Sequence, residues 1–382
     1  MITSNFEIIL VAAFFSLIAI RLFLKRKEIR VEKIVILEYS KRYAKKINET
    51  VVSYPKIFKI IGILALGSAP LLTFVGIYYL INSLVSFKPS VALVLPTIST
   101  FRYPGPIISV PFWIWIVAIF IIVFSHESLH ALIAASEGIK TKRYGLLYFL
   151  IIPIGAFVDI DEKKLGRMEI KSKIKIFAGG SFGNLIVFGV FIMMLIIFSY
   201  LINFFLESKG VWFNNTAPNS PAESVGLKGV IVRIGNKTIM NVYDLQEFLK
   251  ETKPNTTITI ETTEGKYKLT LEKKDNTSYI GIVGVKNYIV YKGTNKIVSE
   301  NLLFLINYLF LAFQWISFLS LGVAIANMLP ILPLDGGLII REILKETWGE
   351  KGEKISQLIS AVFLILLFFS LFLSSLTLRV VS

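Results

Sequence analysis

The sequence predicts a polytopic α-helical membrane protein that carries an inserted, soluble-like α+β domain. Of its 382 residues 54% are hydrophobic, and the mean hydropathy of +0.67 lies above the range of ordinary soluble proteins. Charge-poor runs long enough to cross a bilayer recur along the chain. A polar stretch over 211–290 interrupts them. We therefore expect about six transmembrane helices and one folded insert outside the membrane.

The six expected spans are the long apolar runs of the chain. The first run lacks a basic leading region and a small-residue cleavage site, and Lys25-Arg26-Lys27 follows it, so we expect a membrane anchor and not a cleaved signal peptide. A shorter apolar stretch, 144–158, is interrupted by Pro153 and Gly155, which favours a membrane-embedded β-hairpin over a span. The spans cover roughly 6–24, 60–87, 107–135, 176–206, 302–333 and 355–378.

Basic residues predict the orientation of these spans. Ten Lys and Arg fall within 25–56 and nine more within 136–175. By the positive-inside rule both segments are cytoplasmic, so the N-terminus and the polar insert lie outside a cell membrane that the chain crosses several times. The net charge of +15 then reflects orientation and contact with the lipid bilayer. No recognition motif accompanies the basic residues, so we expect no nucleic-acid partner.

Four segments follow from this pattern. Residues 1–56 hold the first transmembrane helix and a basic cytoplasmic connector, and 57–210 hold a transmembrane core with the hairpin. Residues 211–290 form the extracytoplasmic domain, and 291–382 complete the transmembrane core. The chain has no cysteine, which excludes disulfides and thiolate metal ligands.

Both histidines of the chain lie in one string, His126-Glu127-Ser128-Leu129-His130, inside the third apolar run. On a helix, positions i and i+4 share a face, so both rings can hold one metal ion with Glu127 beside them for acid–base chemistry. Satisfied core histidines are the simpler interpretation of such a pair. Ionisable groups are costly in hydrocarbon, however, and three of them on one span indicate a functional site. About eighteen uncharged residues, or ~27 Å of helix, precede His126, so the site is expected in the membrane near its cytoplasmic face.

A catalytic zinc site needs a third protein ligand, which here has to be a carboxylate. Asp335 is the only acidic residue between 302 and 341. We expect Pro330, Pro333 and Gly336-Gly337 to break the helix around it and let the backbone bend toward the histidines. A plain turn explains the same residues taken alone. The depth that Asp335 shares with the histidines favours a ligand, and the ligand types favour zinc.

These motifs resemble the site-2 protease family of intramembrane metalloproteases. The matching positions are the HExxH string, an N-x-x-P-x-x-P-x-D-G-G string that begins at Asn327, and the insert between them. Gly155-Ala156-Phe157-Val158 resembles the family's membrane-embedded β-segment. Residues 178–184, AGGSFGN, resemble its A-G-P-x-x-N stretch, with glycine in the place of proline. The resemblance covers most of 107–342.

The resemblance implies one zinc ion held by His126, His130 and Asp335, with Glu127 as general base and acid. Transmembrane protein substrates would be cleaved within or near the bilayer after partial unwinding, which is regulated intramembrane proteolysis. The Gly155, Ala156, Phe157 and Val158 strand would pair with the extended substrate, and Asn327 would contact substrate or a developing oxyanion. Without the resemblance, the hairpin is interpreted as a plug and Asn327 as a helix-packing amide.

The polar insert resembles a PDZ domain of the circularly permuted protease type. It contains the string S-P-A-x-x-x-G-L from Ser220, and a strand, a helix and two further strands are expected at 229–237, 243–250, 256–261 and 266–272. PDZ domains bind extended peptides by strand addition. We expect an access filter for substrates trimmed on the outside, with a peptide ligand; a folded spacer without a ligand is the alternative.

Two other functions fit parts of the sequence. A membrane-anchored zincin whose active site faces water would take its third ligand from Asp159, Asp161 or Glu162. A non-enzymatic membrane scaffold with a PDZ module would need the histidines for metal binding at most, and would have no use for Glu127.

Overall fold

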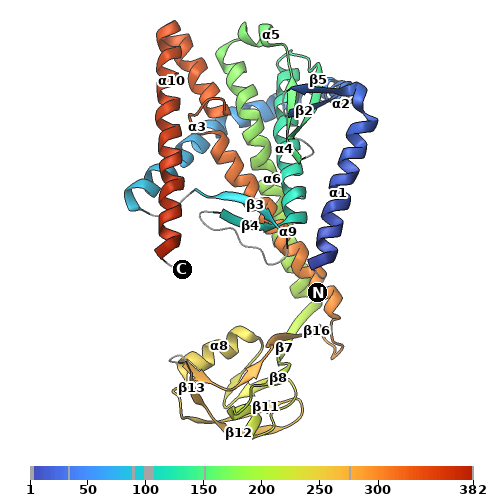
Figure 1. The fold of residues 1–382 in the computed structure, drawn as a ribbon, viewed down its shortest axis with the longest axis vertical. Coiled ribbons are helices and arrows are strands. Elements are labelled where there is room, and N and C mark those ends of the chain that lie inside the picture. Colours follow the sequence, from blue (N-terminus) through green and yellow to red (C-terminus); the bar gives the residue numbers. More distant parts are fainter. Residues whose placement is uncertain are drawn as a thin grey trace. The chain divides into compact units, whose positions relative to one another are not determined.

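The computed structural model describes residues 4–32, 35–87, 91–98, 107–149, 152–274 and 277–380. It divides into two compact units (Figure 1). The first comprises Met1–Met194 together with Leu311–Ser382, and the second is Leu195–Phe310. The predicted insert, 211–290, lies within the second unit, whose bounds also include the ends of two long helices. Each unit has its own buried core.

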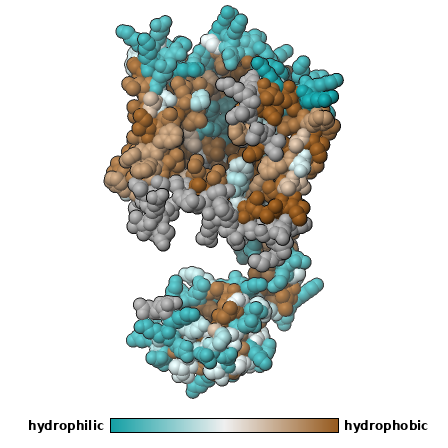
Figure 2. Space-filling view, viewed as in Figure 1, coloured by the Kyte–Doolittle hydropathy of each residue, from teal (hydrophilic) through white to brown (hydrophobic). Residues whose placement is uncertain are grey.

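Helices long and apolar enough to cross a membrane dominate the first unit. Within the described residues five helices meet that criterion, and a sixth helix, α1 (Ser4–Leu24), has a shorter apolar stretch, Ile8–Leu24. Their outward side chains are apolar, and Figure 2 shows hydrophobic side chains over the helices with polar ones gathered at one end of the unit. These features fit a polytopic helical membrane protein. The five are α3 (Pro55–Ser86), α4 (Phe112–Ser136), α6 (Ile170–Phe205), α9 (Glu300–Asn327) and α10 (Asp335–Val380).

The last helix is bent back on itself. At Gly349, φ is 57° and ψ is −134°, so the helical geometry is interrupted there. The main-chain N–H of Leu332, just before the helix, donates to Ser360 Oγ at 2.7 Å. A straight helix would carry Ser360 far from its own start, so this contact requires the fold-back that Figure 1 shows. The second leg contains the run predicted as the last span.

A four-stranded sheet joins the connector after α1 to the segment predicted as a hairpin. The strand order is β1–β2–β5–β6, and β6 is an edge strand. Gly145 in β5 lies opposite Phe157 in β6, and the Phe157 ring occupies the place of any side chain at Gly145. That the hairpin lies inside the membrane stays a prediction. The strands are β1 (Ile29–Glu32), β2 (Val35–Ser40), β5 (Arg143–Phe149) and β6 (Ile152–Asp159).

A buried carboxylate fastens this sheet to α1. Glu38 of β2 is 4% exposed and pairs with Arg21 at 2.9 Å and Lys25 at 2.7 Å. The Tyr148 hydroxyl of β5 donates to the same carboxylate at 2.9 Å. Because a buried charge needs several partners, these contacts fix α1, β2 and β5 relative to one another. A short helix, η1 (Arg26–Glu28), precedes β1, and α2 (Lys41–Ser53) follows β2.

Small buried residues let the long helices approach closely. In membranes, helices associate through close packing, for which alanine and glycine are suited. The shared core of α3, α4, α6 and α9 contains Ala65, Ala69, Ala134, Ala178 and Ala324, each at most 4% exposed. The remaining elements of this unit are α5 (Glu162–Gly166) and the parallel pair β3 (Leu93–Thr97) and β4 (Ile107–Pro111).

Two lysines of α6 tie the helices together at one end of the bundle. Lys175 pairs with Glu137, the residue that follows α4, at 2.7 Å, and Lys173 pairs with Glu342 of α10 at 2.9 Å. All four side chains are at most 21% exposed. Ser172 also donates to Glu137, at 2.5 Å. We refer to these two ion pairs as the lysine clamp.

The second unit is a small α+β domain with an antiparallel main sheet. Its main sheet has the order β12–β11–β9–β7–β16, with β10 paired to β9, and the core is made of aliphatic residues such as Ile231, Ile234 and Ile260. Asn241 caps α8 with a reciprocal capping box. Helix and strands occur where the sequence predicts them, at α8 (Val242–Glu251), β9 (Ile231–Ile234), β11 (Thr257–Thr262) and β12 (Lys266–Thr270). The others are β7 (Leu206–Trp212), β8 (Asn215–Thr216), α7 (Pro221–Ser224), β10 (Lys237–Thr238), β13 (Glu272–Lys274), β14 (Thr277–Tyr279), β15 (Ile282–Val283) and β16 (Lys286–Tyr291).

The lysine clamp predicts a pH-dependent contribution to stability. Burial raises the pKa of Glu137, but hydrogen bonds from Lys175 and Ser172 outweigh burial and hold that pKa below its ordinary value. A carboxyl whose pKa is lower in the folded state stabilises above its unfolded pKa, and this contribution is lost as the pH falls through the folded pKa. We expect Glu137→Gln to reduce the free energy of unfolding by about 1–3 kcal/mol at pH 7.

Thermal melting of the purified protein at pH 7 and at acidic pH measures this effect. The difference in melting temperature between Glu137→Gln and wild type should become smaller at acidic pH. Glu346→Gln is the matched control, because Glu346 is exposed and has no ion pair in the described part of the chain. An equal difference in melting temperature at both pH values would contradict a stabilising role of the Glu137 charge.

Candidate metal centre

Two helices bring the predicted metal ligands together. His126 and His130 lie one turn apart on α4, and Asp335 is the first residue of α10. The Nε2 atoms of the histidines are 3.1 Å apart. Asp335 Oδ2 lies 3.4 Å from His126 Nε2, and Asp335 Oδ1 lies 3.4 Å from His130 Nε2. Side-chain exposure of the three is 10–15%.

These separations suit a tetrahedral metal ion. Two ligand atoms that are each 2.0–2.1 Å from a tetrahedral zinc lie about 3.3 Å from one another. Each of the three residues offers one ligand atom, and these three atoms all lie within 4.8 Å of one another. Two imidazoles and one carboxylate are also the donor set of many catalytic zinc sites, which leave one position open. The residues present therefore fit a zinc ion.

Glu127 sits between the metal triad and the edge strand. It follows His126 on α4 and is partly buried. α4 packs against β6, and the main-chain N–H of Val158 in β6 is near enough to the Glu127 carboxylate to stabilise its charge. The predicted general base and the predicted substrate strand are therefore neighbours.

Helix α6 supports the triad from the side. His130 Nδ1 lies 2.7 Å from the carbonyl oxygen of Ile176, so its Nδ1–H donates and Nε2 is free for a metal. Ser181 Oγ donates to Asp335 Oδ2 at 3.2 Å. The amide of Asn184, which is fully buried, lies 3.2 Å from His126 Nδ1 and accepts from Ser125 Oγ at 3.1 Å. Partners of this kind orient metal ligands and set their tautomers.

The contact between Asn184 and His126 bears on which imidazole nitrogen carries the proton when a metal binds. If His126 presents Nε2 to an ion, its proton lies on Nδ1, which then needs an acceptor. Asn184 now turns its nitrogen toward Nδ1. Rotation of the amide by half a turn places Oδ1 there and lets Nδ2 donate to Ser125 Oγ. An Asn184 amide with Oδ1 toward His126 Nδ1 therefore suits the metal-binding tautomer.

Three glycines of α6 allow this close approach to α4. A Cβ at Gly180 would overlap the Nε2 atoms of both histidines. A Cβ at Gly179 would lie 2.8 Å from Ile133 Cδ1, and one at Gly183 would lie 2.8 Å from the Ser125 carbonyl oxygen. Aligned on Asn184, the six-residue A-G-P-x-x-N pattern has its glycine at Gly180, at the floor of the metal centre, and Ser181 in the place of its proline. The sequence resemblance marked AGGSFGN without assigning Gly180, Ser181 or Asn184 a role; an asparagine within an apolar span was the available signal.

The predicted break before Asp335 is real, but two of the residues expected to cause it have another role. The non-helical segment is 328–334, which contains Pro330 and Pro333. Gly336 and Gly337 are instead in the first turn of α10. Side chains there would overlap the carbonyl groups of Met328 and Ile331, so these glycines allow the turn to pack against the segment that precedes α10. The break is therefore made by the residues before Asp335.

The other predicted site residues are placed as follows. Asn327 is the last residue of α9, is partly buried, and forms no side-chain hydrogen bond within the described ranges. Gly155, Ala156, Phe157 and Val158 lie in β6. The acids of the alternative zincin are engaged elsewhere or exposed: Asp159 pairs with Arg143 at 2.8 Å, Asp161 caps α5, and Glu162 is exposed.

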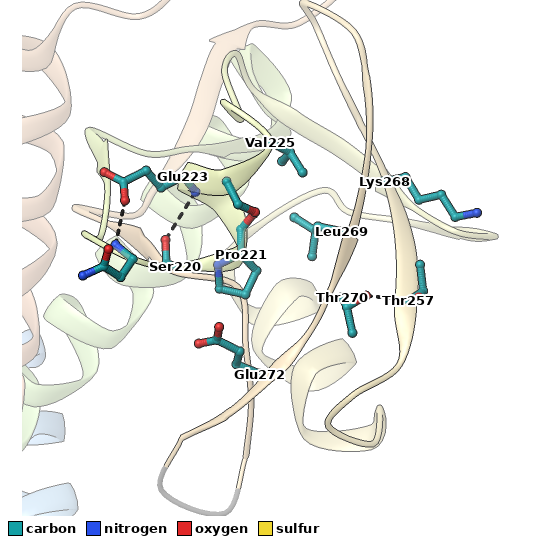
Figure 3. Close-up of a pocket in the computed structure, with 11 residues that line it drawn as sticks. Ser220, Pro221, Glu223, Val225, Thr257, Lys268, Leu269, Thr270 and Glu272 are labelled. Atoms are coloured by element: carbon teal, nitrogen blue, oxygen red, sulfur yellow. Dashed lines mark hydrogen bonds between the residues drawn. The ribbon is translucent and has the colours of Figure 1, made fainter.

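A groove of about 680 Å³ opens in the second unit, between α7 and the edge strand β12 (Figure 3). Ser220, the N-cap of α7, and Glu223 line one side, and Lys268 and Thr270 line the other. Leu269 contributes an apolar floor. The lining is mixed in charge and polarity.

Gly180 supplies a test of the metal centre. We expect Gly180→Ala to weaken zinc affinity by about tenfold to a hundredfold, because the new methyl group displaces both imidazoles. Gly189→Ala on the same helix is the control, since nothing lies within 4 Å of its Cβ position. Competition with a chelator measures the affinity of each purified variant. Equal affinity in both variants would mean that the histidines do not face α6 as described.

Comparisons with known proteins place this centre in a family. An uncharacterized protein of Methanocaldococcus jannaschii is 29% identical over 315 residues, which is 80% of this chain and 77% of that protein. The family model described as Peptidase family M50 matches residues 114–369, which include α4, α6 and the start of α10. This match covers well over half of the chain and confirms the resemblance that the motifs predicted. The chain therefore belongs to peptidase family M50, the site-2 protease family.

Proposed function

We propose that this membrane metallopeptidase is a zinc-dependent intramembrane protease that hydrolyses peptide bonds within or near transmembrane segments of other proteins. One observation carries the proposal: Asp335 of α10 meets His126 and His130 of α4, with Glu127 beside them, in helices apolar enough to span a membrane. A buried carboxylate and two imidazoles are costly in such a bundle unless they bind an ion.

The chemistry of the site follows from the positions of its side chains. A bound zinc ion would supply Lewis-acid polarisation of the scissile carbonyl and would acidify a water molecule. Glu127 would accept a proton from the attacking water and deliver it to the leaving amine. Asn184, Ser181 and the Ile176 carbonyl hold the ligands in orientation and so reduce the reorganisation that binding requires. Asn327 is proposed to contact the substrate or the developing oxyanion.

The substrate is proposed to bind as an extended strand. A peptide bond inside a helix is shielded, so a transmembrane substrate has to unwind, and its backbone then needs partners in a site without free water. β6 is an edge strand next to Glu127, which supports pairing of the substrate with Gly155 to Val158. Cleavage of a membrane-held regulator would make this regulated intramembrane proteolysis.

The second unit is proposed to act as a PDZ-like access filter on the extracytoplasmic side. Its strand and helix order and the S-P-A-x-x-x-G-L string support a PDZ-like fold. We further propose six spans, with α1 as the first, an extracytoplasmic N-terminus, and a metal centre near the cytoplasmic side. The basic residues around α2 and α5 support this orientation. The PDZ ligand would be a peptide.

The two alternatives have less support. A water-facing zincin would need Asp159, Asp161 or Glu162 as the third ligand, whereas Asp335 is the acid 3.4 Å from both Nε2 atoms. A non-enzymatic scaffold gives no reason for a glutamate that directly follows the first histidine and faces an edge strand.

Substitutions at Glu127 and Asp335 test the proposed mechanism. Glu127→Gln should retain zinc and lose about 10²–10⁴-fold in cleavage rate, because the general base is removed. Asp335→Asn should lose both zinc affinity and cleavage. Metal content and cleavage of a model transmembrane substrate are measured on the same purified protein. Asp161→Asn serves as the control and should resemble wild type.

Three results would refute parts of this scheme. If Glu127→Gln cleaved the substrate at the wild-type rate, Glu127 would not be the general base. Full zinc content in Asp335→Asn together with loss in Asp161→Asn would favour the water-facing zincin. If the wild-type protein bound no zinc when zinc was supplied, the non-enzymatic scaffold would be the remaining function.

A proline at Ala156 tests strand pairing. Alternate N–H groups of an edge strand face its free side, and Ala156 lies two residues before Val158, whose N–H is near the Glu127 carboxylate. The Ala156 N–H is therefore the proposed donor to the substrate. Ala156→Pro removes that donor and should slow cleavage by about tenfold with zinc content unchanged. Ala156→Val adds similar bulk but keeps the N–H, and is the matched control. Equal cleavage rates in the two variants would mean that β6 does not pair with the substrate and that the hairpin only fills space in the helix bundle.

A further inference from the structure

A basic groove lies apart from the metal centre, between α2 and the loop that follows α4. It encloses about 520 Å³ and is lined by Lys41, Lys45, Asn48, Glu49, Val52, Ser53, Lys140, Thr141 and Lys142. None of these residues belongs to the triad or its supporting partners. We propose that this groove binds the phosphate headgroup of an anionic membrane lipid, a role beyond the proposed proteolysis.

The groove is preformed because its two walls are fastened together. The Asn48 side chain of α2 donates to the Thr141 carbonyl oxygen at 2.9 Å and accepts from the Thr141 N–H at 3.1 Å. Behind it, Ile47 packs in a core with Ala131 of α4 and Tyr144 of β5. A headgroup can therefore enter without having to order either wall, which lowers the cost of binding.

The charge of the lining suits a phosphate. Four lysines and one glutamate line the groove. Within the described residues Lys41 and Lys140, one on each wall, form no ion pair, while Lys45 and Lys142 form only long ones, at 3.7 and 3.5 Å. The N-terminus of α2 adds the positive end of a helix dipole near Lys41. Lysines that line one groove from two elements can bind a phosphate through several ammonium groups.

The position of the groove favours a lipid over a soluble phosphate. α2 leads through Tyr54 directly into the span α3, and Lys140 to Lys142 follow the end of the span α4. Apolar side chains continue from the lysines toward α3: Val52 is 80% exposed, Tyr54 57% and Ile57 53%. A ligand with a charged head and apolar tails matches both the lysines and this adjoining surface.

The proposal is tested by titrating the purified, full-length protein in neutral detergent with short-chain phosphatidylglycerol. Binding should be saturable, and Lys41→Gln/Lys140→Gln should raise the Kd about tenfold or more, whereas Lys41→Arg/Lys140→Arg should retain most of the affinity. Lys163→Gln/Lys164→Gln removes the same charge from exposed lysines of α5 and should leave the Kd within about twofold. Glu127→Gln should bind like wild type, which separates this site from catalysis.

Four outcomes would overturn the proposal. Equal weakening in the Lys41/Lys140 and Lys163/Lys164 double variants would indicate non-specific attraction to charge. Equal affinity for phosphatidylcholine would make the headgroup charge irrelevant. Displacement of the lipid by glycerol 1-phosphate at the concentrations that suffice for the lipid itself would assign the groove to a soluble anion. An unchanged Kd in a Lys41→Gln/Lys140→Gln protein with wild-type melting temperature would place the lipid elsewhere.

Discussion

The structure depends on the encounter of one carboxylate with two imidazoles inside an apolar helix bundle. Asp335 starts α10, and the histidines are on α4, so the triad exists only where those helices meet. Each of the three side chains is costly to bury alone, and together they reproduce the ligand spacing of a tetrahedral ion. Much of the surrounding packing serves this meeting: three glycines of α6 let it lie against α4, and two glycines of α10 let its first turn lie on the segment before it.

The chemistry of the site was more predictable from the sequence than its support. Two histidines and a single acid in the facing run restrict the choice of metal ligands, because few other side chains can bind zinc. The supporting contacts are different in kind. Ser181 and Asn184 are ordinary polar residues in an apolar run, and the Ile176 carbonyl is a main-chain group, so no residue type announces them. The role of Gly336 and Gly337 was mistaken because the same residues break helices in one context and permit close packing in another.

The sheet shows a further limit of sequence patterns. β5 and β6 pair in antiparallel fashion within the apolar stretch whose interruption by Pro153 and Gly155 favoured a hairpin. β1 and β2 lie in a basic segment that was predicted only as a connector. β2 pairs with β5 across more than a hundred residues, and Glu38 is buried there with Arg21, Lys25 and Tyr148. The sequence alone does not reveal this pairing, because the partners of β2 and of Glu38 are brought together only by the fold. In the sequence Glu38 looks like any exposed charged residue.

Helix α6 explains how the ligands are aligned before any ion binds. Glu137 lies seven residues, about two helical turns, after His130, and Glu342 lies seven residues after Asp335. Lys175 and Lys173 hold those two acids, while Asn184, Ser181 and the Ile176 carbonyl hold the ligands themselves. α6 thus fastens α4 and α10 at two levels. His126, His130 and Asp335 would therefore hold a metal ion between helices that are already in register, which lowers the reorganisation that binding requires.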